Sequence, residues 1–248
     1  MTGTLHAARG PLLLIVGLLV AWQALFFLAG DIALRSPIQT IAYAADLFTR
    51  PAFWPNLQET AKAFAAALAI AVAMGISIGM ALGFSRLAGD VFEPVLVALY
   101  SIPKVTLYPI LLLVFGLGIS AKIAFGAIHG IIPIALFTIN AVRNVRPVLI
   151  KTGRVMKLSP WRMVWRVLFP AALPEIFTGL RIGFALTMIG TVLGEMFASQ
   201  RGLGYMLMNA IGLHNVDVIM ALTLLLTVFA AAVSAILLAI DHRLHRRV

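Results

Sequence analysis

Residues 143–175 read RNVRPVLIKTGRVMKLSPWRMVWRVLFPAALPE and lie between long apolar runs. The first 32 residues of this stretch carry seven cations and no acid. The cations are Arg143, Arg146, Lys151, Arg154, Lys157, Arg162 and Arg166. Apolar residues alternate with these cations, and Pro170 and Pro174 lie near the end of the stretch. Because basic residues beside membrane spans stay in the cytoplasm, we expect this segment to face the cytoplasm and to dock a partner there.

The composition of the chain is that of a membrane protein. Hydrophobic residues make up 62% of the 248 residues and charged residues 11%. A soluble domain of this length could not bury so much apolar surface in one core. The net charge of +10 is concentrated in short segments between apolar runs, which disfavours nucleic-acid binding. The absence of cysteine excludes disulfides and thiolate metal sites.

Charge-poor runs of about 20 residues, the length needed to cross a membrane, recur along the chain. The expected spans are residues 11–30, 63–85, 94–116, 122–142, 179–198 and 217–240. The segment 143–174 would connect the fourth span to the fifth, and residues 38–48 could form a short interfacial helix after the turn at Ser36-Pro37. The sequence therefore predicts an all-α, polytopic membrane protein with six transmembrane helices in a single domain, residues 1–248.

The distribution of cations indicates the orientation of these spans. One side of the membrane would hold Arg9, Arg86, the seven cations of the loop, Arg243, Arg246 and Arg247. The other side would hold Arg35, Arg50, Lys62, Lys122 and Arg201. This asymmetry predicts that both termini are cytoplasmic.

A series of motifs along the chain carries a family resemblance. In and after the loop they are Trp161, Arg166, Val167, Pro170, Ala171, Ala172, Leu173, Pro174, Thr178, Gly179, Leu180 and Arg181. Beyond the loop they are Gly190, Glu195, Met196 and 202–205 downstream, and Gly75, Gly79, Gly83, Ile102, Pro103, Pro109, Phe115 and Gly116 upstream. In these residues the chain resembles the permease subunits of binding-protein-dependent ABC importers, in the nitrate, sulfonate and taurine branch. The resemblance covers nearly the whole chain.

The resemblance implies a type I ABC importer permease fold in the bacterial inner membrane. It implies a path for a small, anionic solute, similar to a sulfonate, taurine or nitrate, delivered by a periplasmic binding protein. The expected partners are a second copy of this chain, two cytoplasmic ABC ATPase subunits and membrane lipids. No metal or cofactor is expected on this chain, since ATP and Mg²⁺ would be bound by the ATPase. The sequence has no GxxxxGK[ST] motif, so this chain is not expected to hydrolyse ATP itself.

The resemblance also assigns a contact with the ATPase to the loop. The implied residues are Lys151, Thr152, Gly153, Arg154, Lys157, Leu158, Ser159, Pro160 and Trp161. The family's Glu-Ala-Ala falls here on residues 151–153 and its glycine falls on Lys157, so a base replaces the usual acid. A matching ATPase would need an acidic or neutral contact at that point. The alternative is an amphipathic helix on the membrane surface, but Pro160 and Pro170 would break the segment into two arms, as a docking element requires.

Three ionisable residues within the expected spans are candidates for the solute path. Lys104 would lie about ten residues into the third span, where a cation is costly and usually faces a cavity or a partner. Its alternatives are snorkelling or a structural pair with Glu93 or Glu195. His129 is either a ligand contact or a hydrogen-bonding core residue. Glu195 would either line the outer entry or fix the turn at residues 202–205.

Two other classes of function remain open on the residues alone. One is a carrier or channel driven by an ion gradient without an ATPase, which predicts paired intramembrane acids or an internal repeat. The other is a membrane scaffold whose basic loop recruits a protein. Capture of an ATPase by the loop would separate both from an importer.

Overall fold

The computed structural model describes the backbone of residues 2–197 and 199–245, and their side chains except at 2–9, 11, 12 and 242–245. All regular elements in these residues are helical, so the predicted all-α class is confirmed. In chain order they are α1 (Thr2–Ala29), α2 (Pro37–Leu47), α3 (Phe53–Phe84), α4 (Arg86–Ser101), η1 (Lys104–Leu107), α5 (Tyr108–Phe115), α6 (Ile119–Arg143), α7 (Pro147–Val155), α8 (Pro160–Met163), η2 (Val164–Leu168), α9 (Phe169–Met196), α10 (Leu203–Gly212) and α11 (Val216–His245).

Four helices in the described residues are long and apolar enough to cross a membrane. They cover Phe53–Phe84, Ile119–Arg143, Pro160–Met196 and Val216–Asp241. A fifth span is counted if the bent pair Arg86–Ser101 and Lys104–Phe115 crosses as one. The apolar helix at Leu13–Ala29, within the first expected span, is shorter. The predicted count of six spans is therefore not confirmed.

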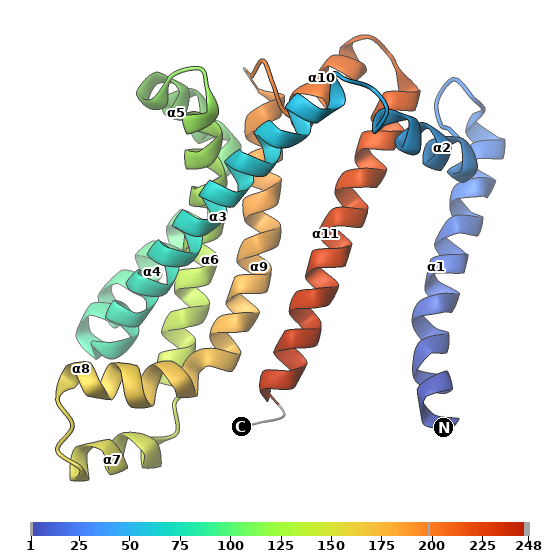
Figure 1. Ribbon diagram of the computed structural model, residues 1–248. Helices are drawn as coiled ribbons and strands as arrows, with labels where there is room; N and C mark the ends of the chain where they lie inside the picture. The colour runs from blue at the N-terminus through green and yellow to red at the C-terminus, as the bar shows by residue number, and fades with distance from the viewer. Residues whose placement is uncertain (1, 198, 246–248) are drawn as a thin grey trace. The chain divides into compact units, whose positions relative to one another are not determined.

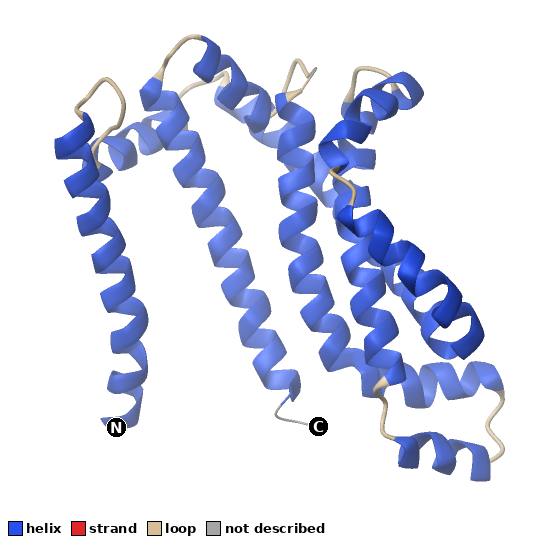
Figure 2. Ribbon diagram, turned by 180° about the vertical axis from the view of Figure 1, so that it is seen from behind, coloured by secondary structure: helices blue, strands red, loops and turns tan. Residues whose placement is uncertain are grey.

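The chain divides into two compact units, residues 1–55 with 206–228 and residues 56–205 with 229–248. In the second unit α6 and α9 lie side by side and make the most extensive contact between helices (Figures 1 and 2). The short helices α7 and α8 lie at one end of these two helices, and α5 lies at the other end (Figure 1).

Glycine spacing explains how closely α3 approaches α6. Gly75, Gly79 and Gly83 recur every four residues and face Ile134, Thr138 and Val142, which are also four residues apart. A Cβ added at Gly75 or Gly83 would come within 2.7 or 2.8 Å of the opposing side chain. Only glycine fits such an approach, and residues four apart share one helix face. The glycine stripe therefore lets α3 pack closely on α6.

The third expected span, residues 94–116, is not a straight helix. The helix α4 ends at Ser101, and α5 begins at Tyr108 after the single 3₁₀ turn η1. The two parts are bent by 88°. Pro103 lies at this break, where its missing N–H group cannot continue the helical hydrogen bonds.

The first unit contains α1, α2 and their connection. As predicted, a short helix follows Ser36, whose side chain caps the amide of Gln39 while the Gln39 side chain bonds the amide of Ser36. Arg35 lies just before this cap and bonds the carboxylates of Asp31 and Asp217. The hydrogen bond with Asp217 raises the pKa of the Arg35 guanidinium further above its ordinary value. These contacts fix where the chain leaves α1.

Candidate coupling site

The helix α7 begins at Pro147 and ends in a Schellman turn. The N–H of Leu158 donates to the carbonyl of Gly153, and the N–H of Lys157 donates to the carbonyl of Arg154. Lys157 has a φ of 51°, the left-handed conformation that this turn requires and that glycine adopts most readily. This is the position onto which the family glycine falls. The backbone therefore retains a glycine-like turn although the sequence places a lysine in it.

A second arm follows this turn and runs directly into α9. Ser159 caps α8 by accepting a hydrogen bond from the amide of Arg162, and Pro160 occupies the first helical position, where proline is favoured. The π-helical segment η2 then leads into α9, whose first turn contains Pro170. A wide turn of this kind lets a helix continue next to a proline that cannot donate. Pro170 was expected to end the second arm, but the helix bends here and continues.

The two arms, residues 147–155 and 160–168, form a bracket fixed to α6 and α9. Leu149 and Ile150 of the first arm pack against a buried apolar cluster that joins the second arm to α6 and α9. The cluster consists of Ala141, Val142, Val145, Met163, Leu168, Ala172 and Ile176. Gly153 is buried against Met163, and a Cβ added there would come 2.7 Å from the Met163 side chain. This packing couples α7 to α8, and α8 is continuous with α9. A force on the bracket would therefore act on the long helices as on one body.

The outer face of the bracket is both apolar and basic. Trp161 is 71% exposed and Trp165 is 50% exposed, and their rings lie 5.5 Å apart between centroids. The other exposed large apolar residues are Val148, Val155 and Met156, and the exposed cations apart from Arg154, which points toward α4, are Lys151, Lys157, Arg162 and Arg166. Exposed aromatic residues with arginine are typical of protein interfaces.

Of the nine residues that the resemblance assigned to coupling, seven are exposed, Leu158 is half-buried and Gly153 is buried. Gly153 thus acts within the bracket. Trp165 is not among the nine residues predicted for coupling. Its spacing of four residues from Trp161 would have placed both on one helix face.

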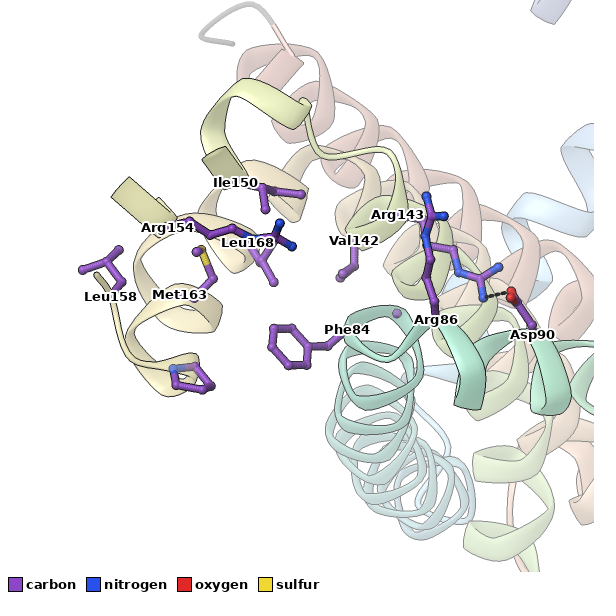
Figure 3. Close-up of a pocket in the computed structure, with 12 residues that line it drawn as sticks. Phe84, Arg86, Asp90, Val142, Arg143, Ile150, Arg154, Leu158, Met163 and Leu168 are labelled. Carbon is purple, nitrogen blue, oxygen red and sulfur yellow. Dashed lines mark hydrogen bonds and ion pairs between the residues drawn. The ribbon is translucent and has the colours of Figure 1, made fainter. Parts of the chain in front are cut away.

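A cavity of about 610 Å³ separates the bracket from the turn between α3 and α4. Figure 3 shows Arg154 reaching into it from the bracket side, while Arg86 and Arg143 lie at the opposite wall. Its remaining lining is largely apolar and includes Phe84, Val142 and Leu168. The bracket is therefore packed on α6 and α9 but leaves a gap toward α4.

Arg143, at the end of α6, ties this helix to α4. Its guanidinium bonds Glu93 at 2.6 Å and Asp90 at 2.7 Å. From its position in the sequence, Arg143 was expected only as a cation of the loop. The signal available was the pair of acids spaced by three residues on the predicted cytoplasmic side, opposite a loop without acids.

Glu195 is fully buried near the end of α9 that is remote from the bracket. Its Oε2 atom accepts hydrogen bonds from the Thr60 hydroxyl at 2.8 Å and from the Gly204 amide at 2.9 Å. Gly202 has a φ of 124° and lies against the carboxyl group, where a Cβ would overlap it. These contacts favour the alternative in which Glu195 fixes the turn at residues 202–205.

The buried cation in this region is Lys122. Its ammonium donates to Glu59 at 3.0 Å and to the carbonyl of Arg201 at 2.7 Å. Nearby, the Tyr108 hydroxyl bonds the carbonyls of Gly194 and Phe197. The end of α9 is therefore held by polar contacts from three other segments.

His129 and Lys104 differ sharply in their surroundings. His129 is 8% exposed, its Nδ1 lies 2.8 Å from the Phe125 carbonyl, and its ring packs against Gly190. These are the contacts of a core residue.

Lys104 is partly exposed, donates to the carbonyl of Tyr100 at 3.0 Å and lies 4.5 Å from the centroid of the Tyr100 ring. Glu93 and Glu195 bond other residues, so the suggested structural pair with either one is wrong.

Comparison with known proteins gives concordant matches. Residues 71–248 match the family model described as "Binding-protein-dependent transport system inner membrane component". A probable ABC transporter permease protein of Haemophilus influenzae is 31% identical over 237 residues, covering 95% of each chain. The riboflavin transport system permease protein RibX of Chloroflexus aurantiacus is 36% identical, covering 82% of this chain and 76% of the relative. The nitrate import permease protein NrtB of Synechocystis is 30% identical, covering 81% and 76%.

Among solved structures, an inward-facing form of the MetNI methionine ABC transporter matches with a TM-score of 0.70 at 20% identity. The match covers 79% of this chain and 98% of that chain. It shows that the fold is that of a type I ABC importer permease.

Proposed function

The chain belongs to the family of binding-protein-dependent transport inner-membrane components as the permease subunit of an ABC importer, and we propose that two copies enclose a path for a small anion. A permease subunit of this family is a multi-pass inner-membrane protein and is not itself catalytic. The importer includes an ATPase and a binding protein. ATP is used by the ATPase, so the chemistry of hydrolysis lies outside this chain.

The coupling role is proposed for the outer face of the bracket. The single observation that carries it is a solvent-exposed pair of tryptophans on an element fixed by a buried cluster to α6 and α9. Trp161 and the adjacent cations would enter a cleft of one ATPase subunit, and the second copy would engage the other subunit. Because the face holds bases and no acid, the cleft would present acidic or neutral groups.

Closure of the ATPase pair on ATP would then shift the bracket and, with it, the long helices. The continuity of α8, η2 and α9 supports a rigid-body transfer of this shift. This arrangement requires the bracket and both termini to be cytoplasmic. The outer end, with Glu195 and the turn at 202–205, would face the periplasm and receive solute from the binding protein.

The anionic nature of the solute is proposed from the nitrate relative and from the nitrate, sulfonate and taurine branch that the loop resembles. Of the three path candidates, Lys104 is the one with a partly exposed side chain. Its ammonium group has no acidic partner in the described residues. His129 and Glu195 would support the helices around the path. The RibX relative makes riboflavin a compound to include in any binding assay.

The experiment is purification of this chain together with the products of its neighbouring genes, to see whether an ATPase is captured, followed by solute-stimulated ATP hydrolysis in proteoliposomes. Trp161→Ala and Lys151→Glu should reduce ATPase capture at least about tenfold, as expected when a central interface residue is removed. Trp54→Ala is the matched control, since Trp54 is also exposed, at 46%, but lies outside the bracket. Undiminished capture by both bracket variants would refute the coupling role.

A further inference from the structure

A second cavity, of about 500 Å³, lies between α4, α9 and the later part of α11. Its polar lining comes from Tyr100, Arg181 and Ser234, one from each helix. The side chains between them are apolar, among them Ile182, Leu186 and Leu238. It is an open, mainly apolar depression with three polar groups in its lining, a combination that can hold a small molecule.

Arg181 is a cation placed well inside a membrane-length helix. It lies 12 residues after Phe169 and 15 before Met196, or about 18 and 22 Å from the ends of α9 at 1.5 Å per residue. Its side chain is partly buried and has no hydrogen bond or ion pair with any other described residue. Counted on the expected span 179–198, Arg181 lies in the first turn, and a cation inside a span usually faces a partner or an aqueous path.

Lys104 approaches the same tyrosine from the break between α4 and α5. Its ammonium lies 4.5 Å from the centroid of the Tyr100 ring, and within the described part of the chain it forms no ion pair with a carboxylate. Tyr100 therefore lies beside one cation and lines a cavity with the other. Arg181 is the charged residue of the cavity lining, Lys104 lies on the Tyr100 ring at its edge, and the acid nearest along the chain, Asp241 on α11, bonds Thr178 one turn before Arg181.

We propose that Arg181 and Lys104 bind a small oxyanion, such as a sulfonate, beside Tyr100 in this cavity. The planar fork of an arginine suits two oxygens of such a group, and the hydroxyls of Tyr100 and Ser234 supply further donors. The apolar wall would accept a short alkyl part. This site specifies the anion path of the proposed function and rests on it.

The natural absence of cysteine permits a direct test with one introduced thiol. Ser234→Cys is placed in the full chain, reconstituted without an ATPase in phosphatidylcholine nanodiscs. The thiol is modified with methanethiosulfonates bearing either a sulfonate or a trimethylammonium group. The modification rate with each reagent is divided by the rate at which the same reagent modifies a small thiol in solution, and the ratio of the anionic to the cationic value measures charge selectivity. Two cations in a low-dielectric cleft should favour the anionic reagent at least about tenfold.

Arg181→Gln should bring this ratio most of the way to unity, and Lys104→Gln should lower it in part. Lys62→Gln is the control, because it removes an exposed cation on α3 and should leave the ratio unchanged. Ethanesulfonate should slow the modification, while the uncharged dimethyl sulfone should not. An unchanged ratio in Arg181→Gln, or no protection by ethanesulfonate, would overturn the site. Should Arg181→Gln fail to assemble, the Lys104→Gln ratio and the protection of the parent thiol decide the question.

A lipid headgroup in the cavity would give a different pattern of protection. If phosphatidylglycerol in the nanodisc protects the thiol and ethanesulfonate does not, the cavity holds a lipid headgroup and the proposal is wrong. The thiol ratio is read on the permease alone, so it does not depend on ATPase capture. A parent thiol without charge selectivity in a complex that captures its ATPase and takes up solute would refute the site alone, whereas failure to capture an ATPase would refute the coupling role.

Discussion

The strained turn of the bracket predicts that Lys157→Gly stabilises the protein. Lys157 has a φ of 51°, and the left-handed conformation costs a residue with a Cβ about 1–2 kcal/mol. Glycine avoids this cost but loses about 0.5–1 kcal/mol through the greater freedom of the unfolded chain. The net gain should be about 0.5–1 kcal/mol. Lys157→Asn should fall between the two, since asparagine tolerates this conformation and also removes the charge.

The matched control is Met156→Gly, one residue earlier. Met156 has an ordinary φ of −73°, so glycine there brings the entropic loss without any relief of strain. That variant should be destabilised by about 0.5–1 kcal/mol, opposite in sign to Lys157→Gly. Unfolding by sodium dodecyl sulfate in mixed micelles, followed by tryptophan fluorescence, measures both. If Lys157→Gly is no more stable than Met156→Gly, the assignment of a Schellman turn is wrong.

Three other predictions concern contacts between helices. Gly79→Ala should cost about 1–3 kcal/mol of stability because the added Cβ overlaps α6. In the control Gly17→Ala the added Cβ meets nothing within 4 Å, so the change should be neutral or stabilising. Equal effects of the two changes in the same titration would argue against close packing. Glu195→Ala should cost about 2–4 kcal/mol of stability because it leaves the buried donors of Thr60 and Gly204 unpaired. Glu195→Gln should cost less because the amide oxygen remains an acceptor. Equal losses of stability in the two variants would count against the hydrogen-bonded turn. Arg143→Ala should cost about 1 kcal/mol, reduced further at high salt because its partners are partly exposed, and an effect insensitive to salt would contradict the ion pair.

Local signals in the sequence predicted much of the fold. The turn at Ser36-Pro37 marked the start of α2, where the structure shows a capping box with Gln39 and a proline at the first helical position. The four-residue glycine spacing indicated the face of α3 that packs on another helix. These features depend on residues within one or two turns of each other, which is why they can be read from the chain alone.

The contacts that place the site residues depend on distant segments. Glu195 bonds Thr60, which is 135 residues away, and Arg143 bonds Glu93, 50 residues away. Pro103 lies within the third expected span, but the spacing of residues did not predict the 88° bend between α4 and α5. For the same reason the partners of Lys104 could not be chosen correctly from spacing.

Cross-linking of the bracket to the ATPase is a direct test of the coupling role, because an adduct forms only where the two chains lie side by side. Met156→Cys, at a residue 68% exposed, introduces a single thiol in a chain without cysteine. Val114→Cys on α5, at a residue 70% exposed, is the control at the opposite end of the same unit. With a short thiol-to-amine linker on the assembled complex, we expect an ATPase adduct from Met156→Cys and none from Val114→Cys. An adduct from Val114→Cys alone, or an unmodified ATPase beside a fully reactive Met156→Cys thiol, would show that the bracket does not dock on the ATPase.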